Sequence, residues 1–402
     1  MRRFGSLGGS PITERVCPAT AGLRHSMVDR APPRRTVESA LSAAERRRAK
    51  EKGVTRALQH EVSALQGEVK QLHAVLGQKL GVNSRGIKDA FGKEFAMAVD
   101  EEHKATKLHI FNFTNPHGRA FHTSWFGFFA SFFTMFTSAP LMNEIRKPSS
   151  LNLSTMDIVH ADICAVSTNI VSRIVTGYVC DIVGPRRTLA FLCFVICPAA
   201  LGMLWVGSAA GFIVCRGVIG LGLATFVTSQ VWCTQMYSKS VVGLANATSA
   251  GWGNMGGGVT NLVMPFVFSA IYNLLDGTPL DKEDRAWRYC YFLPVALCLV
   301  AGCAALTGRD LPDGNIGQLE KTGAKQKPQG RIVMRTGLCN VNAWVLTITY
   351  GMCFGVELTM NSVAFLYFHD YHGLAPHEAG LYASLYGLMN LFARSLGGQL
   401  SL

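Results

Sequence analysis

Long stretches without a charged residue dominate the pattern of hydrophobic and polar positions in the last three quarters of the chain. Residues 188–207 and 289–308 contain no Asp, Glu, Lys or Arg, and residues 240–275 continue for 36 positions without one. A helix needs about 20 mostly apolar residues to cross the hydrocarbon core of a bilayer. Soluble helices show one apolar stripe, whereas these segments are apolar on all sides. The pattern therefore predicts transmembrane helices rather than the core helices of a soluble enzyme.

Eight such segments are predicted, which gives an all-α membrane protein. Arg186 and Arg187 lie in the turn between the second and third segments, and six basic residues lie in the polar loop 308–337. Basic residues mark the cytoplasmic side of short loops. If the spans alternate, both loops and the N-terminus are cytoplasmic and the loop 143–157 faces outward. The predicted segments are approximately 120–142, 158–182, 187–207, 210–234, 241–273, 288–307, 338–366 and 376–402.

The beginning of the chain differs from the rest in its charge. Residues 1–88 hold 17 Lys or Arg against 7 Asp or Glu, which accounts for +10 of the total charge of +12. Residues 1–36 fit either a transit peptide or disorder. Apolar residues from Leu58 to Leu76 follow the a/d spacing of a coiled coil over fewer than three heptads. We expect residues 1–90 to form a basic, partly disordered cytoplasmic extension with a coiled-coil segment, followed by a cytoplasmic pre-span segment at 91–119.

Enzyme chemistry has no recognisable signature in this sequence. The 12 cysteines lie mostly inside the predicted spans, with neither zinc-binding spacing nor the pattern of a secreted disulfide protein. The sequence shows no phosphate-binding loop and no nucleophile motif. We therefore expect no enzyme activity, no metal and no cofactor.

Ionisable residues inside the predicted spans mark candidate functional positions, because charge is costly in a bilayer. Arg173-x3-Gly177 recurs as Arg394-x3-Gly398, at an offset of 221 residues. We expect the two arginines to face each other across a central cavity, which favours a small anion as the ligand. The four ionisable residues that stand out are Arg173, Arg216, Glu357 and Arg394.

A motif of glycine, acid and arginine occupies the turn between the second and third spans. Its members are Gly177, Asp181, Gly184, Arg186 and Arg187. Here the chain resembles the major facilitator superfamily, whose fold has two parallel halves of six spans each. We expect the glycine to allow close helix packing, and the Asp and Arg to form a charge latch at a helix end. A second superfamily motif contains Arg216 in the fourth span. We expect Arg216 to have a structural role, paired with the backbone or with neighbouring helices.

Five glycines within eight positions stand out in the fifth predicted span, in the stretch AGWGNMGGG at 250–258. Each glycine weakens a helix by about 1 kcal/mol relative to alanine, but in a membrane it allows close contact with another helix or a ligand. The stretch resembles the nitrate signature of the nitrate/nitrite porter family, in particular the plant and algal high-affinity nitrate transporters. The resemblance covers residues 95–402, with further similar stretches at 95–129, 309–321, 350–358 and 390–398.

This resemblance implies the members of a substrate site. It implies nitrate binding by Arg173 and Arg394, with Tyr350 and Phe354 lining the site. A first-span phenylalanine would pack over the planar ion, either Phe132 or Phe133. The path would be shaped by Asn254, Gly251, Gly253, Gly256 and Gly257. Glu357 would carry a proton, or else form a structural salt bridge.

The resemblance also implies an activity, partners and a location. It implies proton-coupled symport of nitrate, or nitrite, by alternating access, in a multi-pass protein of the plasma membrane that serves nitrate assimilation. Algal and plant members often need a single-span accessory protein. A complete member has twelve spans, whereas this chain ends in the eighth. We expect an N-terminal six-helix bundle at 120–307, a central cytoplasmic loop at 308–337, and the start of a truncated C-terminal bundle at 338–402 that does not transport by itself.

Two other functions fit parts of the sequence. One is a truncated, non-transporting membrane protein with a regulatory role. The other is a membrane-tethered DNA-binding factor that uses the basic and heptad residues 45–76. Gly53 interrupts that helix, and no Asn stands where a base-reading residue is expected. We therefore expect no nucleic-acid partner.

Overall fold

The computed structural model describes residues 92, 94–321 and 335–400, and its regular secondary structure in that part of the chain is helical. This confirms the predicted all-α fold. The extension 1–90, with its expected coiled coil, lies outside the described residues. The helices are α2 His117–Phe136, α3 Ser138–Ile145, α4 Thr155–Val183, α5 Pro185–Gly202, α6 Ala209–Gly220, η1 Leu221–Ala224, α7 Thr225–Met236, α8 Val242–Leu274, α9 Pro279–Tyr289, α10 Phe292–Leu306, α11 Ile316–Lys321, α13 Val341–His372, α14 Pro376–Leu388 and α15 Asn390–Leu400.

Within the described ranges, seven helical segments are long and apolar enough to cross a membrane. They correspond to the first seven predicted segments. The eighth predicted segment, 376–402, is instead two shorter helices, α14 and α15, which are separated at Met389. The seven segments are His117–Ile145, Thr155–Val183, Pro185–Gly202, Ala209–Met236, Val242–Leu274, Pro279–Leu306 and Val341–His372.

Local sequence signals fix both ends of α4. At its start, the Ser154 side chain accepts a hydrogen bond from the Asp157 backbone N–H, and the Asp157 carboxylate accepts one from the Ser154 N–H at 2.9 Å. This reciprocal capping box satisfies donors that the first helical turn leaves unpaired. At its end, Gly184 has φ +98°, a conformation that side chains with a Cβ rarely adopt. Pro185 follows at the first position of α5, where proline favours helix initiation.

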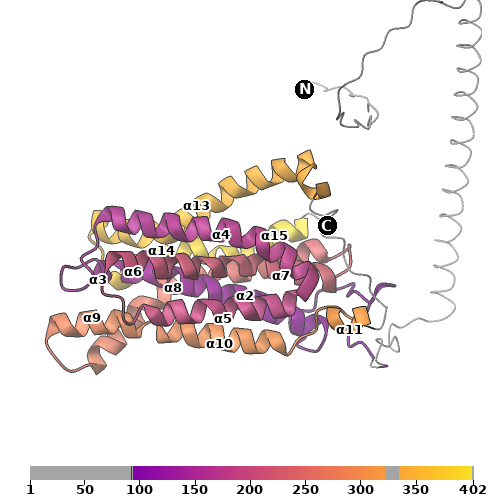
Figure 1. The fold of residues 1–402 in the computed structure, drawn as a ribbon, viewed down its shortest axis with the longest axis horizontal. Coiled ribbons are helices and arrows are strands. Elements are labelled where there is room, and N and C mark those ends of the chain that lie inside the picture. The colour runs from indigo at the N-terminus through magenta and orange to yellow at the C-terminus, as the bar shows by residue number, and fades with distance from the viewer. Residues whose placement is uncertain (1–91, 93, 322–334, 401–402) are drawn as a thin grey trace, which may run out of the picture. The chain divides into compact units, whose positions relative to one another are not determined.

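The helices α2 and α8 form the centre of the bundle (Figure 1). Glycines of α8 allow this packing, because an added Cβ at Gly253 would lie 1.8 Å from the Phe128 ring. A Cβ at Gly256 would lie 2.5 Å from the backbone oxygen of Phe129. On another face of α8, Gly258 lies directly against the backbone of Gly387 in α14. The glycine run therefore packs α8 closely against both α2 and α14.

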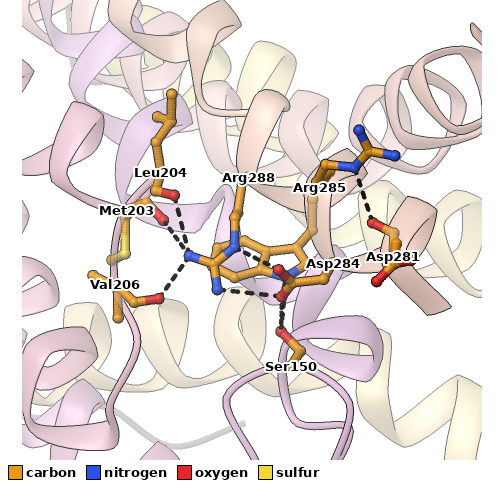
Figure 2. A network of polar contacts seen from close by, with 9 residues as sticks. Ser150, Met203, Leu204, Val206, Asp281, Asp284, Arg285 and Arg288 are labelled. Carbon is orange, nitrogen blue, oxygen red and sulfur yellow. Dashed lines mark hydrogen bonds and ion pairs between the residues drawn. The ribbon is translucent and has the colours of Figure 1, made fainter. Parts of the chain in front are cut away.

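A polar network ties together the end of the bundle that carries α3 and α9. The Asp284 carboxylate pairs with Arg288 through Nε at 2.9 Å and Nη2 at 3.2 Å, and it accepts a hydrogen bond from Ser150 at 2.6 Å. Trp287 Nε1 also donates to Ser150 Oγ at 2.9 Å. Arg288 Nη1 points at three backbone carbonyls beyond the end of α5 (Figure 2), those of Met203, Leu204 and Val206. One arginine therefore joins the segment that follows α5 to the Asp284 carboxylate of α9.

We predict that Arg288→Ala lowers the free energy of unfolding by about 2 kcal/mol, because it removes the partner of both the carbonyls that follow α5 and the Asp284 carboxylate. Thermal unfolding of the detergent-solubilised chain measures this loss. The matched control is Arg285→Ala on the same helix (Figure 2), since Arg285 bonds to exposed backbone oxygens of Asp276 and Asp281. Equal melting temperatures for the two variants would contradict the structural role of Arg288.

We also predict that Gly253→Ala destabilises the protein by about 1–3 kcal/mol, because the new methyl group forces α2 away from α8. Gly177→Ala is the control, since an added Cβ there meets no atom within 4 Å. That control is expected to be neutral or slightly stabilising, because alanine favours the helix. Melting temperatures of both variants provide the comparison. A Gly253→Ala variant as stable as the wild type would show that α2 and α8 do not need the close contact.

Candidate functional site

The two arginines of the internal repeat have the same local geometry. Arg173 lies on α4, and its Nε donates to Asn169 Oδ1 at 3.0 Å. Arg394 lies on α15, and its Nε donates to Asn390 Oδ1 at 2.9 Å. In both cases the asparagine precedes the arginine by four residues, so both side chains lie on the same face of their helix. The offset of 221 residues therefore relates two Asn–Arg pairs and not only two arginines.

Aromatic rings surround the guanidinium group of Arg173. Its Cζ lies 4.3 Å from the ring centroid of Phe354 and 4.9 Å from that of Phe226. These distances are typical of cation–π contacts, which strengthen when the cation is removed from water. Arg173 Nη2 is buried and makes no hydrogen bond of normal geometry with any described residue, although the neighbouring Tyr350 side chain interacts with the guanidinium group. Arg173 therefore keeps a buried donor that can bind a further partner.

Arg394 is compensated, in contrast to Arg173. Its Nη2 lies 2.5 Å from Glu357 Oε2 on α13. Asn390 Nδ2 donates to the other carboxylate oxygen, Oε1, at 2.9 Å. The Glu357 side chain is only 7% exposed and the Arg394 side chain is 24% exposed, so the acid is the more buried member of the ion pair. With its amide oxygen turned toward Arg394, Asn254 of α8 accepts from Nε at 3.1 Å and from Nη2 at 2.8 Å.

The predicted aromatic residues lie together beside Arg173. Tyr350 and Phe354 stack along α13 with ring centroids 5.6 Å apart, and Tyr350 also stacks on Phe226 at 5.7 Å. Of the two first-span candidates, Phe132 lies 6.3 Å from Phe354, whereas the ring contact of Phe133 is with its neighbour Phe129. The geometry therefore favours Phe132 as the first-span member of this cluster.

The glycines predicted to shape the path make contacts with neighbouring helices. Gly253 and Gly256 face α2, as described above. A Cβ at Gly251 would lie 2.4 Å from the backbone oxygen of Asn390. A Cβ at Gly257 would lie 3.0 Å from the Phe136 ring. These positions bring α8 close enough for Asn254 to reach Arg394.

The charge latch has a different acidic partner from the predicted one. Asp181 makes no ion pair with any residue that the structure describes. Asp310, which follows α10, accepts from the Arg186 backbone N–H at 3.2 Å, and its carboxylate lies 3.9 Å from Arg186 Nε. Burial raises the pKa of Asp310 above its usual value, although Arg186 and Arg187 favour its charged form. A Cβ at Gly184 would collide with Asp310, at 2.4 Å from Oδ1.

Arg216 has the structural role expected for it, whereas Gly177 does not. An added Cβ at Gly177 would meet open space among the described residues, so the close helix packing expected there is not observed. Arg216 is buried, lies 2.5 Å from Asp162 Oδ1 and donates to the Met135 carbonyl. This arrangement agrees with the structural pairing expected for Arg216.

Four contributors to these sites were not predicted from the sequence. Phe226 is the second residue of α7, which follows the 3₁₀ turn in the fourth span, and no motif marks it. Asn169 and Asn390 could have been found, because both precede a repeated arginine by four residues. Asp310 could not be found, because its contact with Arg186 joins segments more than 120 residues apart.

One cavity in the described part of the chain does not coincide with this cluster. It measures about 420 Å³ and lies between α2, α4 and α13. Its walls are mostly apolar, and they include none of the predicted substrate residues. We place the candidate site at the arginines because the internal repeat and the aromatic cluster meet there, around an Arg173 Nη2 that is buried and has no hydrogen-bond partner among the described residues.

Comparison with known proteins is consistent with this arrangement. Residues 124–402 match the family profile of the Major Facilitator Superfamily. The chain is 43% identical to the high affinity nitrate transporter 2.5 of Arabidopsis thaliana, over 77% of this chain and 60% of that protein. It is 40% identical to the high-affinity nitrate transporter 2.3 of Oryza sativa subsp. japonica, over 79% and 60% respectively. It is 39% identical to the nitrate transporter 2.2 of Chlamydomonas reinhardtii, over 77% and 60%.

These similarities confirm the resemblance inferred from the sequence. The three relatives are named as transporters and not as enzymes. The chain spans about 60% of the length of each of them. The chain therefore belongs to the Major Facilitator Superfamily, as a multi-pass membrane protein related to the high-affinity nitrate transporters.

Proposed function

We propose that this protein binds nitrate, or nitrite, and is part of a proton-coupled nitrate transporter. The observation that carries the proposal is the buried Arg173 guanidinium, which lies against two aromatic rings and keeps Nη2 unpaired. An uncompensated buried cation is costly, so a small anion is the expected partner. The nitrate transporters to which the chain is similar support the identity of that anion.

The physical chemistry of nitrate suits this environment. Nitrate is planar, singly charged and weakly hydrated. A guanidinium group can donate two parallel hydrogen bonds to two oxygens of such an ion. The stacked rings of Tyr350 and Phe354 favour a flat ligand over a tetrahedral one. Nitrite shares the charge and planarity, so the same contacts serve both ions.

Glu357 supplies the proposed link to protons. While it is ionised, its carboxylate holds Arg394 Nη2 at 2.5 Å and competes with any anion for that group. Protonation removes the negative charge and weakens the ion pair. Arg394 is then available to the anion beside Arg173. Binding of a proton would therefore favour binding of nitrate, which is the thermodynamic requirement for symport.

Alternating access is supported by a difference between the two ends of the bundle. At the end expected to face outward, Arg146 after α3 forms a bidentate ion pair with Asp370 of α13, at 2.8 and 2.9 Å. At the opposite end, α13 diverges from α4 (Figure 1). We propose that residues 120–307 and 338–402 belong to two halves that are closed on the outer side in this conformation. Movement of the halves would expose the arginines to each side in turn.

The remaining features of the proposal concern location and partners. We propose the plasma membrane as the location, with the lipid bilayer around the apolar helix faces. A single-span accessory protein is a proposed partner, on the basis of the family resemblance. Nitrate assimilation is the process that such a transporter would serve.

We predict that Arg173→Lys weakens nitrate binding by at least tenfold, because an ammonium group cannot donate two parallel hydrogen bonds to the planar ion. Calorimetric titration of the purified chain with nitrate measures the affinity, and uptake by proteoliposomes measures transport. Arg285→Lys carries the same substitution outside the site and should bind like the wild type. A wild-type chain that fails to bind nitrate contradicts the proposal, and binding without uptake favours the regulatory alternative.

We predict that Glu357→Gln removes the pH dependence of nitrate binding, because glutamine mimics the protonated acid at every pH. Wild-type affinity should rise as the pH falls through the range in which Glu357 takes up its proton. The variant should stay at the high-affinity limit, and its uptake should lose proton coupling. Titrations between pH 5 and pH 8 test this expectation. A variant with the pH profile of the wild type would rule out Glu357 as the coupling group.

A further inference from the structure

The asparagines Asn169 and Asn390 hold equivalent places in the two halves. Each accepts a hydrogen bond from the Nε of the arginine one turn later, at 3.0 and 2.9 Å. Asn169 is only 3% exposed, and burial makes such a bond costly to lose. With Nε held, the guanidinium plane is fixed and the Nη atoms are directed away from the asparagine. Both residues therefore orient an arginine without occupying the donors that would bind an anion.

The two asparagines differ in one respect. Asn390 uses its second amide atom, Nδ2, to donate to Glu357 Oε1 at 2.9 Å. Among the described residues, Asn169 has no comparable bond to an acid. Asn390 thus contacts the Arg394 guanidinium through its oxygen and the Glu357 carboxylate through its nitrogen.

We propose that Asn169 and Asn390 are positioning residues for the two anion-binding arginines, and that Asn390 alone also couples the protonation of Glu357 to Arg394. This inference rests on the proposed nitrate binding and extends it to two residues outside the predicted site. When Glu357 takes up a proton, Asn390 loses a charged acceptor but keeps its bond to Arg394 Nε. Protonated Glu357 therefore releases Arg394, while the bond from Asn390 keeps the plane of the Arg394 guanidinium group fixed.

The other groups around Glu357 do not replace this role. Arg394 on α15 is its ion-pair partner. Arg173 on α4 and Tyr386 on α14 interact with it electrostatically without a hydrogen bond. From α8, the side chain nearest to this pair is the uncharged Asn254. Asn390 is thus an uncharged residue that forms hydrogen bonds with both Glu357 and Arg394.

The test compares Asn169→Ala with Asn390→Ala in the full chain, reconstituted in nanodiscs and titrated with sodium nitrate between pH 5 and pH 8. Loss of one buried hydrogen bond should weaken nitrate binding about threefold to tenfold in each variant. Only Asn390→Ala should also move the midpoint of the pH dependence, because only Asn390 of the two asparagines donates to the Glu357 carboxylate. The Asn169→Ala midpoint should match the wild type.

A third variant distinguishes positioning from a general loss of structure. Asn169→Gln keeps a neutral amide oxygen as an acceptor for Arg173 Nε, so it should restore affinity to within about twofold of the wild type. Unchanged affinity in both alanine variants, or an equal midpoint shift in both, overturns the inference while leaving nitrate binding intact. Failure of Asn169→Gln to restore affinity also overturns it. A wild-type chain that binds no nitrate at any pH overturns the proposed function together with this inference.

Discussion

The burial of the Arg173 charge is the constraint on which the rest of the structure depends. Removing a guanidinium group from water is expensive, and the cost is repaid only by closely fitted partners. Here those partners are the rings of Phe226 and Phe354 and the Asn169 side chain. The rings cover the faces of the guanidinium group and Asn169 accepts from Nε, but Nη2 has no hydrogen-bond partner of normal geometry among the described residues. The fold thus holds a charged group that is oriented, largely dehydrated and still able to bind.

Close helix packing is what makes that arrangement possible. The glycines of α8 let it lie against the backbones of α2, α14 and α15. At such short separations Asn254 reaches Arg394, and Phe132 of α2 reaches Phe354 of α13. A larger side chain on α8 would move these helices apart. The glycine run therefore acts on the site indirectly, through the distances between the helices that carry its charged and aromatic residues.

The sequence predicted features that depend on local pattern. Seven spans followed from uncharged length, and the two arginines followed from a repeat and a family motif. Features that depend on contacts between distant segments were missed or wrong. The latch motif suggested Asp181, whereas Arg186 contacts Asp310 more than 120 residues away. The contact of Phe226 with Arg173 likewise joins two different helices. No periodicity along one helix encodes them.

The asymmetry between the two arginines accounts for the proposed coupling. With Glu357 ionised, the two arginines and this acid carry a combined charge of +1. Adding both a proton and a nitrate ion leaves that charge at +1, whereas adding only one of them changes it to +2 or 0. In a low-dielectric interior such changes are costly. The empty and doubly loaded forms therefore present the membrane with the same buried charge. An acid beside one arginine, and aromatic rings beside the other, would then make binding of the proton and the anion mutually dependent.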